Sequence, residues 1–332
     1  MVHSIRRDLF FTVSESNLMK LESVKAQVLS LPEVTAWPEM AGIFERSVSH
    51  VKWEFPVMAC QAVGGEPLAA AVSAAIIACI QLSLVLVDDM LDEDPRGAHY
   101  QLGQATTANL AFALEAAAFR LIAHAPVEAD RRAAVSASLA QMALTSAFGQ
   151  SLDAQNLSGE ENYWRIVRAK SGACFGAALH IGALLGQAPP EVAERLRDFG
   201  ALVGEVIQIY DDLLDALQSP AGPDWRQGRN NLAILYALTA DHPDRARFKA
   251  LLPQIDDPQA LATAQQILIR CGATSYCAYH VIKRTQAGRQ LLDDTPLADP
   301  TPMRDLLARQ TEPLVTLLQN IGAEIPSELA GV

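Results

Sequence analysis

The chain has 332 residues, of which 50% are hydrophobic, and a formal net charge of −12. This acidic balance, without a stripe of clustered Lys and Arg, argues against a nucleic-acid partner, whose phosphates need basic side chains. Its five cysteines show no Cys-x-x-Cys spacing. They are typical of small buried side chains in a reducing compartment, so we expect a cytoplasmic protein.

The predicted elements are all helices, because Ala and Leu dominate, strand-type alternation is scarce, and Pro and Gly cluster where helices end. In chain order they span residues 15–31, 38–51, 56–63, 67–91, 104–123, 128–153, 161–186, 190–217, 229–239, 244–252, 258–273, 275–292 and 301–320. No long linker interrupts the chain. The predicted fold class is therefore all-α, a single-domain bundle of ten or more helices over residues 1–332.

The most apolar segment, residues 72–87, is short for a membrane span, carries Gln81 and runs into three aspartates. The central helices are apolar nearly all round, which is typical of helices buried inside a larger bundle. The sequence therefore predicts a soluble protein with no stable membrane insertion.

Two acidic clusters of the same pattern lie near the ends of two apolar helices. Residues 88–92 read Asp-Asp-Met-Leu-Asp and residues 211–215 read Asp-Asp-Leu-Leu-Asp. The first and last Asp of each cluster share a helix face, at the helix end where the macrodipole disfavours anions. One such cluster is also typical of a solvated helix face. Two copies with apolar flanks favour Mg²⁺, which takes carboxylate oxygens and keeps other positions for water and phosphate.

The motifs around these clusters resemble those of the trans-prenyl diphosphate synthases, also called the polyprenyl synthetase family, over roughly residues 40–295. Residues 86–97 and 204–215 are similar to the two aspartate-rich motifs, and residues 149–153 and 168–172 to two middle signatures. In that family the helices surround a deep apolar cavity, with three Mg²⁺ ions between the motifs at its mouth. The resemblance implies an isoprenoid synthase type of fold and a homodimer.

The resemblance also implies roles for individual residues. Asp88, Asp92 and Asp211 would bind Mg²⁺ directly, with Asp89, Asp212 and Asp215 supporting them. Lys170 would bind the diphosphate and act in catalysis with Asp88, Asp92 and Asp211. The other implied substrate-binding residues are Lys52, Gln81, Arg96, Gln208 and Arg229. An allylic prenyl diphosphate would ionise, and isopentenyl diphosphate would attack the cation and extend the chain by five carbons.

The acceptor side departs from the family pattern. Residues 51–56 match a Gly-Lys-Arg-x-Arg-Pro segment but place Phe55 where the family has Arg. The usual Arg-Arg pair is reduced to Pro95-Arg96. A Lys after the second motif has no counterpart, although Arg229 stands where another Lys is common. We therefore expect weak binding of isopentenyl diphosphate or a different acceptor.

Product length is predicted from Ser83 and Leu84, which lie about one helical turn below Asp88. Short-chain members of the family carry a bulky aromatic at this level. Ser83 is small and Leu84 is not aromatic, so the cavity should be open and the product C20 or longer. The alternative is that Ser83 packs against a neighbouring helix and bonds its own backbone.

Three functions remain open at this point. The first is head-to-tail condensation by a Mg²⁺-dependent prenyltransferase. The second keeps the fold and the ionisation but uses another acceptor or cyclises the substrate, as in a terpene synthase. The third is a non-catalytic helical scaffold that binds divalent metal.

Overall fold

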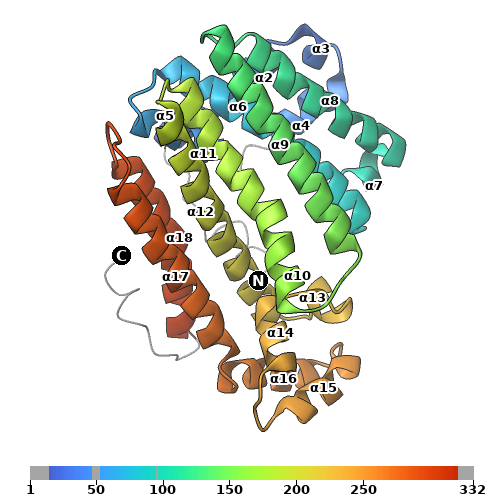
Figure 1. Cartoon of the computed structure of the whole chain (residues 1–332). Coiled ribbons are helices and arrows are strands. Elements are labelled where there is room, and N and C mark those ends of the chain that lie inside the picture. Colours follow the sequence, from blue (N-terminus) through green and yellow to red (C-terminus); the bar gives the residue numbers. More distant parts are fainter. Residues whose placement is uncertain (1–14, 47–52, 95, 321–332) are drawn as a thin grey trace.

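The computed structural model describes residues 15–46, 53–94 and 96–320, and these form helices (Figure 1). Their bounds are α2 (Glu15–Leu29), α3 (Pro32–Thr35), α4 (Pro38–Arg46), α5 (Glu54–Ala62), α6 (Pro67–Leu91), α7 (His99–Leu102), α8 (Gln104–Ala123), α9 (Ala129–Ala154), α10 (Glu160–Val167), η2 (Arg168–Gly172), α11 (Ala173–Leu185), α12 (Pro190–Leu217), α13 (Pro223–Arg226), α14 (Leu232–Thr239), α15 (Arg245–Leu251), η3 (Leu252–Gln254), α16 (Pro258–Arg270), α17 (Ala273–Asp293) and α18 (Thr301–Asn320). Among the described residues no strand is present, which confirms the all-α prediction.

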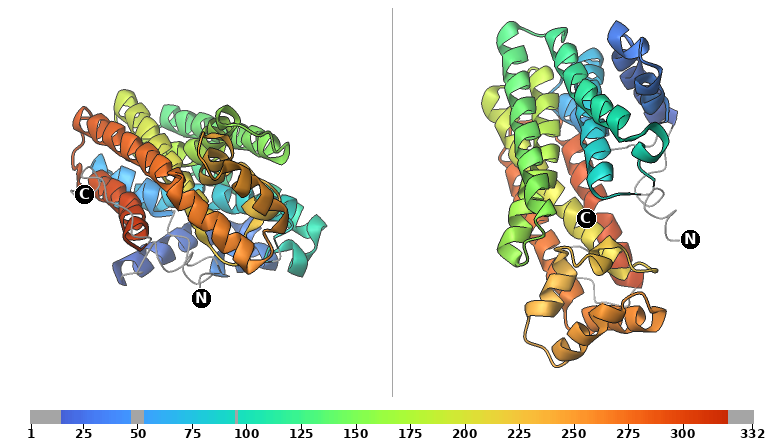
Figure 2. Two further views of the ribbon diagram at one scale, coloured as in Figure 1. Left: turned by 90° about the horizontal axis from the view of Figure 1, so that it is seen from below. Right: turned by 90° about the vertical axis from the view of Figure 1, so that its right-hand side faces the viewer.

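Helices α6 and α11 lie at the centre of the bundle. Their sequences are apolar nearly all round, and most of their side chains are buried. Close approach to α5 requires a small residue on α11, because a Cβ at Gly182 would collide with the backbone of Pro56. Helices α2, α8, α9 and α12 pack around these two helices, and α18 packs against α5 and α12 (Figures 1 and 2).

A second cluster of buried residues fills the other end of the molecule, where α13 to α16 gather below the long helices (Figure 1). Helix α12 contributes to both clusters, with Val203 in the first and Ile209 in the second. The C-terminal half of α12, which carries the second acidic cluster, thus packs mainly in the second cluster of buried residues.

The predicted helices agree with the structure apart from details. The predicted helix 161–186 is interrupted by the π-helical turn η2, and α3, α7 and α13 are short helices that the pattern did not indicate. The π-helical turn η2 is defined by hydrogen bonds between residues i and i+5, and the spacing of hydrophobic residues does not reveal them. Part of the predicted helix 38–51 lies outside the described residues.

Helix α6 has the length and composition of a membrane span, but 78% of its most apolar window is buried inside the molecule. Burial of this extent is that of a core helix in a soluble protein. The prediction of a soluble bundle is therefore supported.

Candidate active site

The two acidic clusters lie where the sequence predicted them. Asp88 and Asp89 are in the last turn of α6 and Asp92 follows its final residue, while Asp211 and Asp215 lie in the last two turns of α12. The side chains of Asp88 and Asp92 are 44% and 31% exposed. Two carboxylates of the first cluster are therefore accessible to a ligand.

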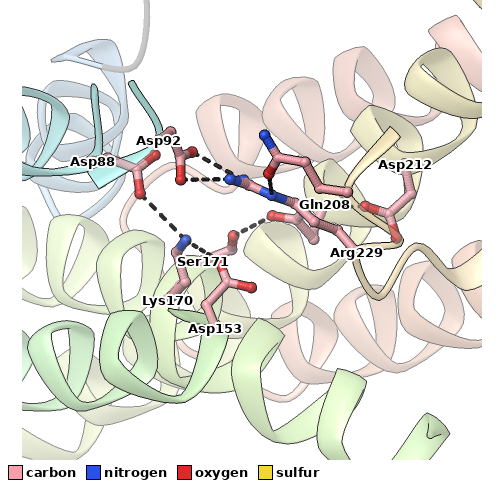
Figure 3. A network of polar contacts seen from close by, with 9 residues as sticks. Asp88, Asp92, Asp153, Lys170, Ser171, Gln208, Asp212 and Arg229 are labelled. Atoms are coloured by element: carbon pink, nitrogen blue, oxygen red, sulfur yellow. Dashed lines mark hydrogen bonds and ion pairs between the residues drawn. The ribbon is translucent and has the colours of Figure 1, made fainter. Parts of the chain in front are cut away.

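Lys170 connects three segments at this end of the bundle. Its Nζ lies 2.7 Å from Oδ2 of Asp153 on α9 and 3.4 Å from Oδ1 of Asp88 on α6 (Figure 3). Burial alone lowers the pKa of Lys170, but the charges of Asp88 and Asp153 outweigh it and the net shift is upward. The lysine is therefore held as a cation. It lies in η2, and π-helical turns often occur at functional sites.

Arg229 bridges the segment after α13 to the first acidic cluster. Its Nη1 and Nη2 donate to the two carboxylate oxygens of Asp92, at 3.0 and 2.7 Å, and its Nε donates to Gln227 (Figure 3). The hydrogen bond to Asp92 is the main reason that the pKa of Arg229 is raised. A bidentate pair of this kind is geometrically specific.

Arg96 forms its ion pair with Asp94, whereas Arg229 pairs with an aspartate of the first acidic cluster. Its guanidinium donates to the carboxylate of Asp94 at 2.9 and 2.5 Å, and its side chain is 67% exposed. The hydrogen bond to Asp94 raises the pKa of Arg96, and the charge of Asp215 contributes to this rise. Asp215 on α12 also accepts from Gln218 at 2.9 Å. Arg96 is therefore influenced by the charge of an aspartate from each cluster, Asp89 and Asp215.

A hydrogen-bond chain lies behind the mouth of the site. Ser171 donates to Gln208 at 2.9 Å, and Gln208 donates to Asp212 at 3.0 Å (Figure 3). The second oxygen of Asp212 accepts from the backbone N–H of Leu232 at 2.9 Å. Helix α12 reaches η2 closely because Gly204 has no Cβ, which would lie 2.5 Å from the backbone oxygen of Ser171.

In each cluster the pKa of the second aspartate is raised. Asp212 is 4% exposed, and burial followed by the charge of Asp224 raises its pKa well above the ordinary value. Burial, then the charges of Asp94 and Asp88, raise the pKa of Asp89 to about 6. Through its hydrogen bond with Leu232, Asp212 holds the start of α14, and its role behind the metal ligands stays a prediction.

A cavity of about 580 Å³ begins at Asp88 and Lys170 and extends between α6, α8 and α9. Ser83 and Leu84, the two positions singled out for product length, both line it. Most of the other lining residues are apolar, and two of them, Val85 and Leu144, are exposed to solvent. The predicted apolar cavity next to the first acidic cluster is therefore present.

The structure describes two of the residues considered for the acceptor side, Phe55 and Gln81. Phe55 is 2% exposed, and its ring centroid lies 5.1 Å from that of Phe175. It is a core residue, so an Arg introduced here would be buried and would not face a ligand. Lys52 lies outside the described residues. Gln81 is half-buried, with its amide 3.9 Å from the sulfur of Cys174.

Several residues of this region had no predicted role. Asp153 belongs to a quoted signature, but the sequence did not indicate that it contacts Lys170. Glu115, Phe119 and Ser146 line the cavity from α8 and α9, at positions outside the recognised motifs. Glu115 and Phe119 are four residues apart and therefore share one face of α8. The sequence shows this spacing, but the spacing alone does not indicate that the two side chains line a cavity.

The donor set fits Mg²⁺, since Asp88 and Asp92 offer carboxylate oxygens to a hard cation. No group of three or more His, Cys, Asp or Glu side chains is arranged as a complete metal site within the described residues. Mg²⁺ usually needs only one or two carboxylates and takes its remaining ligands from water and phosphate. The cations of Lys170 and Arg229 on these carboxylates mark a place that accepts positive charge.

Comparison with known proteins decides the family, since the polyprenyl synthetase family model matches residues 54–268. The chain belongs to the polyprenyl synthetase family. It is 34% identical over 229 residues to a nonaprenyl diphosphate synthase of Mycobacterium tuberculosis, covering 64% of this chain and 67% of that protein. It is 27% identical over 254 residues to an octaprenyl diphosphate synthase of Escherichia coli, covering 72% and 79%.

Solved structures show the same fold. A geranylgeranyl pyrophosphate synthetase from Pyrococcus horikoshii superposes with a TM-score of 0.78 at 22% identity, over 90% of this chain and 97% of that one. A decaprenyl diphosphate synthase from Rhodobacter capsulatus gives 0.75 at 22% identity, over 92% and 98%. The predicted fold, family and prenyltransferase class are confirmed.

Proposed function

We propose that this member of the polyprenyl synthetase family ionises an allylic prenyl diphosphate and condenses it with isopentenyl diphosphate, giving a longer polyprenyl diphosphate. The observation that carries the proposal is Lys170, a cation held between Asp88 and Asp153 at the mouth of an apolar cavity. A diphosphate there would meet positive charge, while its hydrocarbon would enter a largely apolar space that shields the cation from water.

Mg²⁺, of which the family resemblance implies three ions, would supply positive charge that neutralises the leaving pyrophosphate. Asp88, Asp92 and Asp211 would hold the metal, with Asp89, Asp212 and Asp215 behind them. Lys170 and Arg229 would exchange their carboxylate partners for diphosphate oxygens, since charge-assisted hydrogen bonds to phosphate are strong. Gln208 would keep Asp212 and Ser171 aligned through the hydrogen bonds on either side of its amide.

Acceptor binding is assigned to Lys52, Gln81 and Arg96. A specific observation favours a second candidate, because Phe55 is buried in the core and Arg96 is engaged with Asp94. Of two basic contacts expected at an acceptor diphosphate, the one at position 55 is absent and the one from Arg96 is occupied by Asp94. The second candidate keeps the ionisation but uses a different acceptor or an intramolecular double bond.

One assay separates these functions. The protein with Mg²⁺ is supplied with an allylic diphosphate in the presence and absence of isopentenyl diphosphate, and the products are identified by mass. Elongation that requires isopentenyl diphosphate supports the first function. Pyrophosphate release with an unextended product supports the second, and no release at all would leave a scaffold that binds metal.

We also propose a single domain and a homodimer in the cytoplasm. Helix α12 supports the first by contributing to both buried clusters. Phe112, Leu144 and Phe148 support the second, as large apolar side chains that are 75%, 74% and 51% exposed on α8 and α9. Size-exclusion chromatography with light scattering tests the assembly, and a monomeric mass at micromolar concentration would contradict it.

A further inference from the structure

The cavity wall is not apolar along its whole depth. Besides Asp88, Gln150 and Lys170, three polar side chains line it, Ser83 on α6, Glu115 on α8 and Ser146 on α9. We call these three residues the polar band. The cavity is also lined by Ile80, Ala140 and Ala143, which lie further along α6 and α9 from Asp88 and Asp153 than Ser83 and Ser146 do, and by Phe119 on α8.

The helical rise places two members of the band at one level. Asp88 and Asp153 both contact Lys170 and so mark the mouth. Ser83 lies five residues before Asp88, and Ser146 lies seven residues before Asp153. At 1.5 Å per residue these positions are roughly 7 and 10 Å from the mouth. Glu115 faces the same cavity from the third helix.

One member of the band, Ser146, has an unmet need for hydrogen bonding. Ser146 is 4% exposed, and its hydroxyl has no hydrogen-bond partner within the described part of the chain. A buried hydroxyl without a partner is costly, and a carboxylate such as that of Glu115 is costlier to remove from water. A prenyl chain carries no donor or acceptor. When it passes the band, it therefore leaves these groups without water or any other partner.

We propose, on the basis of the function proposed above, that the polar band limits chain length by holding water midway down the cavity. Chains that end above the band keep that water in place. Chains that cross it must displace the water, so elongation beyond the band is disfavoured although Ser83 leaves space and the cavity continues. Product length would thus be limited by the free-energy cost of desolvating three polar groups, and not by a bulky side chain that blocks the cavity.

The test measures product lengths for the full-length protein and for Ser146→Ala and Glu115→Leu, with Thr145→Ala as the matched control. Thr145 is the neighbouring hydroxyl residue on α9 and is not among the cavity-lining residues. Each band variant should raise the ratio of longer to shorter products by about tenfold, the factor that corresponds to one partly compensated hydroxyl. The Thr145 variant should keep the wild-type ratio.

A steric end wall predicts a different pattern. In that case Phe119→Ala would lengthen the products while Ser146→Ala and Glu115→Leu would not, and this result would overturn the proposal. Wild-type protein that forms no elongated product would contradict the proposed function itself. Binding of two prenyl diphosphates, one short and one long, is therefore also measured by calorimetry without acceptor. If the ratio of the affinities for the long and the short ligand were the same in Ser146→Ala and Glu115→Leu as in the wild type, the polar band would be rejected. This result would not depend on the proposed condensation.

Discussion

The guanidinium of Arg229 forms a bidentate ion pair with the carboxylate of Asp92, across 137 positions of the sequence. Asp92 is predicted to bind Mg²⁺, so Arg229 and the metal would compete for the same carboxylate oxygens. A bound diphosphate would end this competition, because Arg229 would then bind the diphosphate oxygens. The pair links the segment after the second acidic cluster to the first cluster.

Arg229→Gln tests this pair. We expect kcat/KM for the allylic diphosphate to fall roughly 10- to 100-fold, the loss of one charge-assisted contact. Mg²⁺ should bind more tightly to the variant in calorimetry without diphosphate, because its competitor is gone. Arg226→Gln is the control, since Arg226 is half-exposed and pairs with Asp256. If both variants bound Mg²⁺ with equal affinity, Arg229 would not compete with the metal for Asp92.

Asp88→Ala and Asp211→Ala test the two acidic clusters. Each substitution should reduce turnover by about a thousandfold or more, because one lost interaction of about 4 kcal/mol has that effect. Circular dichroism should show an intact fold, since removing crowded carboxylates relieves repulsion. Asp198→Ala, an exposed position on α12, should retain full activity. Near-normal turnover of either cluster variant at saturating Mg²⁺ would contradict the metal assignment.

Ser83→Phe tests whether hydrocarbon occupies the cavity. The phenyl ring would fill space one turn below Asp88, so products should become shorter and long allylic substrates should bind poorly. Ser83→Ala removes the hydroxyl, a member of the polar band, without adding bulk, so its products should become longer and not shorter. Product lengths are read by mass spectrometry, and an unchanged distribution in Ser83→Phe would place the chain elsewhere.

Phe55→Arg is expected to destabilise the fold and not to restore an acceptor site. Phe55 is buried against Phe175, so the variant places a charge in the core and loses aromatic packing. We expect a loss of about 3 kcal/mol or more in the free energy of unfolding, measured by urea titration. Phe55→Leu should lose less. A stable Phe55→Arg protein with tighter binding of isopentenyl diphosphate would show that the side chain reaches the ligand.

His180 provides a pH test away from the site. It is buried between α9 and α12, with Nδ1 2.8 Å from Ser138 and 2.7 Å from Arg197. Burial, then the charge of Arg197, lower its pKa to about 4 from an ordinary value of 6.5. The unfolded chain therefore binds the proton first, and stability present above pH 6.5 is lost as pH falls towards 4.

At most about 3 kcal/mol of unfolding free energy should be lost through His180 over this interval. His180→Gln should flatten this part of the stability profile, measured by urea titration at successive pH values. His124→Gln changes an exposed histidine and should leave the slope unchanged. An unaltered slope in His180→Gln would assign the pH dependence to other groups.

The sequence alone determined the helices and the placement of the acidic clusters. Helix formation depends on spacing within a few turns, and Pro and Gly mark where it stops, so the bounds of α6, α8, α12 and α18 were close to those predicted. The clusters could be read for the same reason, since Asp88 and Asp92 share a face by local geometry. Motif resemblance supplied the family.

The tertiary structure decided which side chains meet. Lys170 contacts Asp88 across 82 positions and Arg229 contacts Asp92 across 137, and no local periodicity fixes such distances. The same holds for the polar band, whose members come from three helices, and for Phe55, whose burial depends on how α5 packs against α11. Helix packing angles and the close approaches at Gly182 and Gly204 set these contacts, because they fix the distances between helices that are far apart in the sequence.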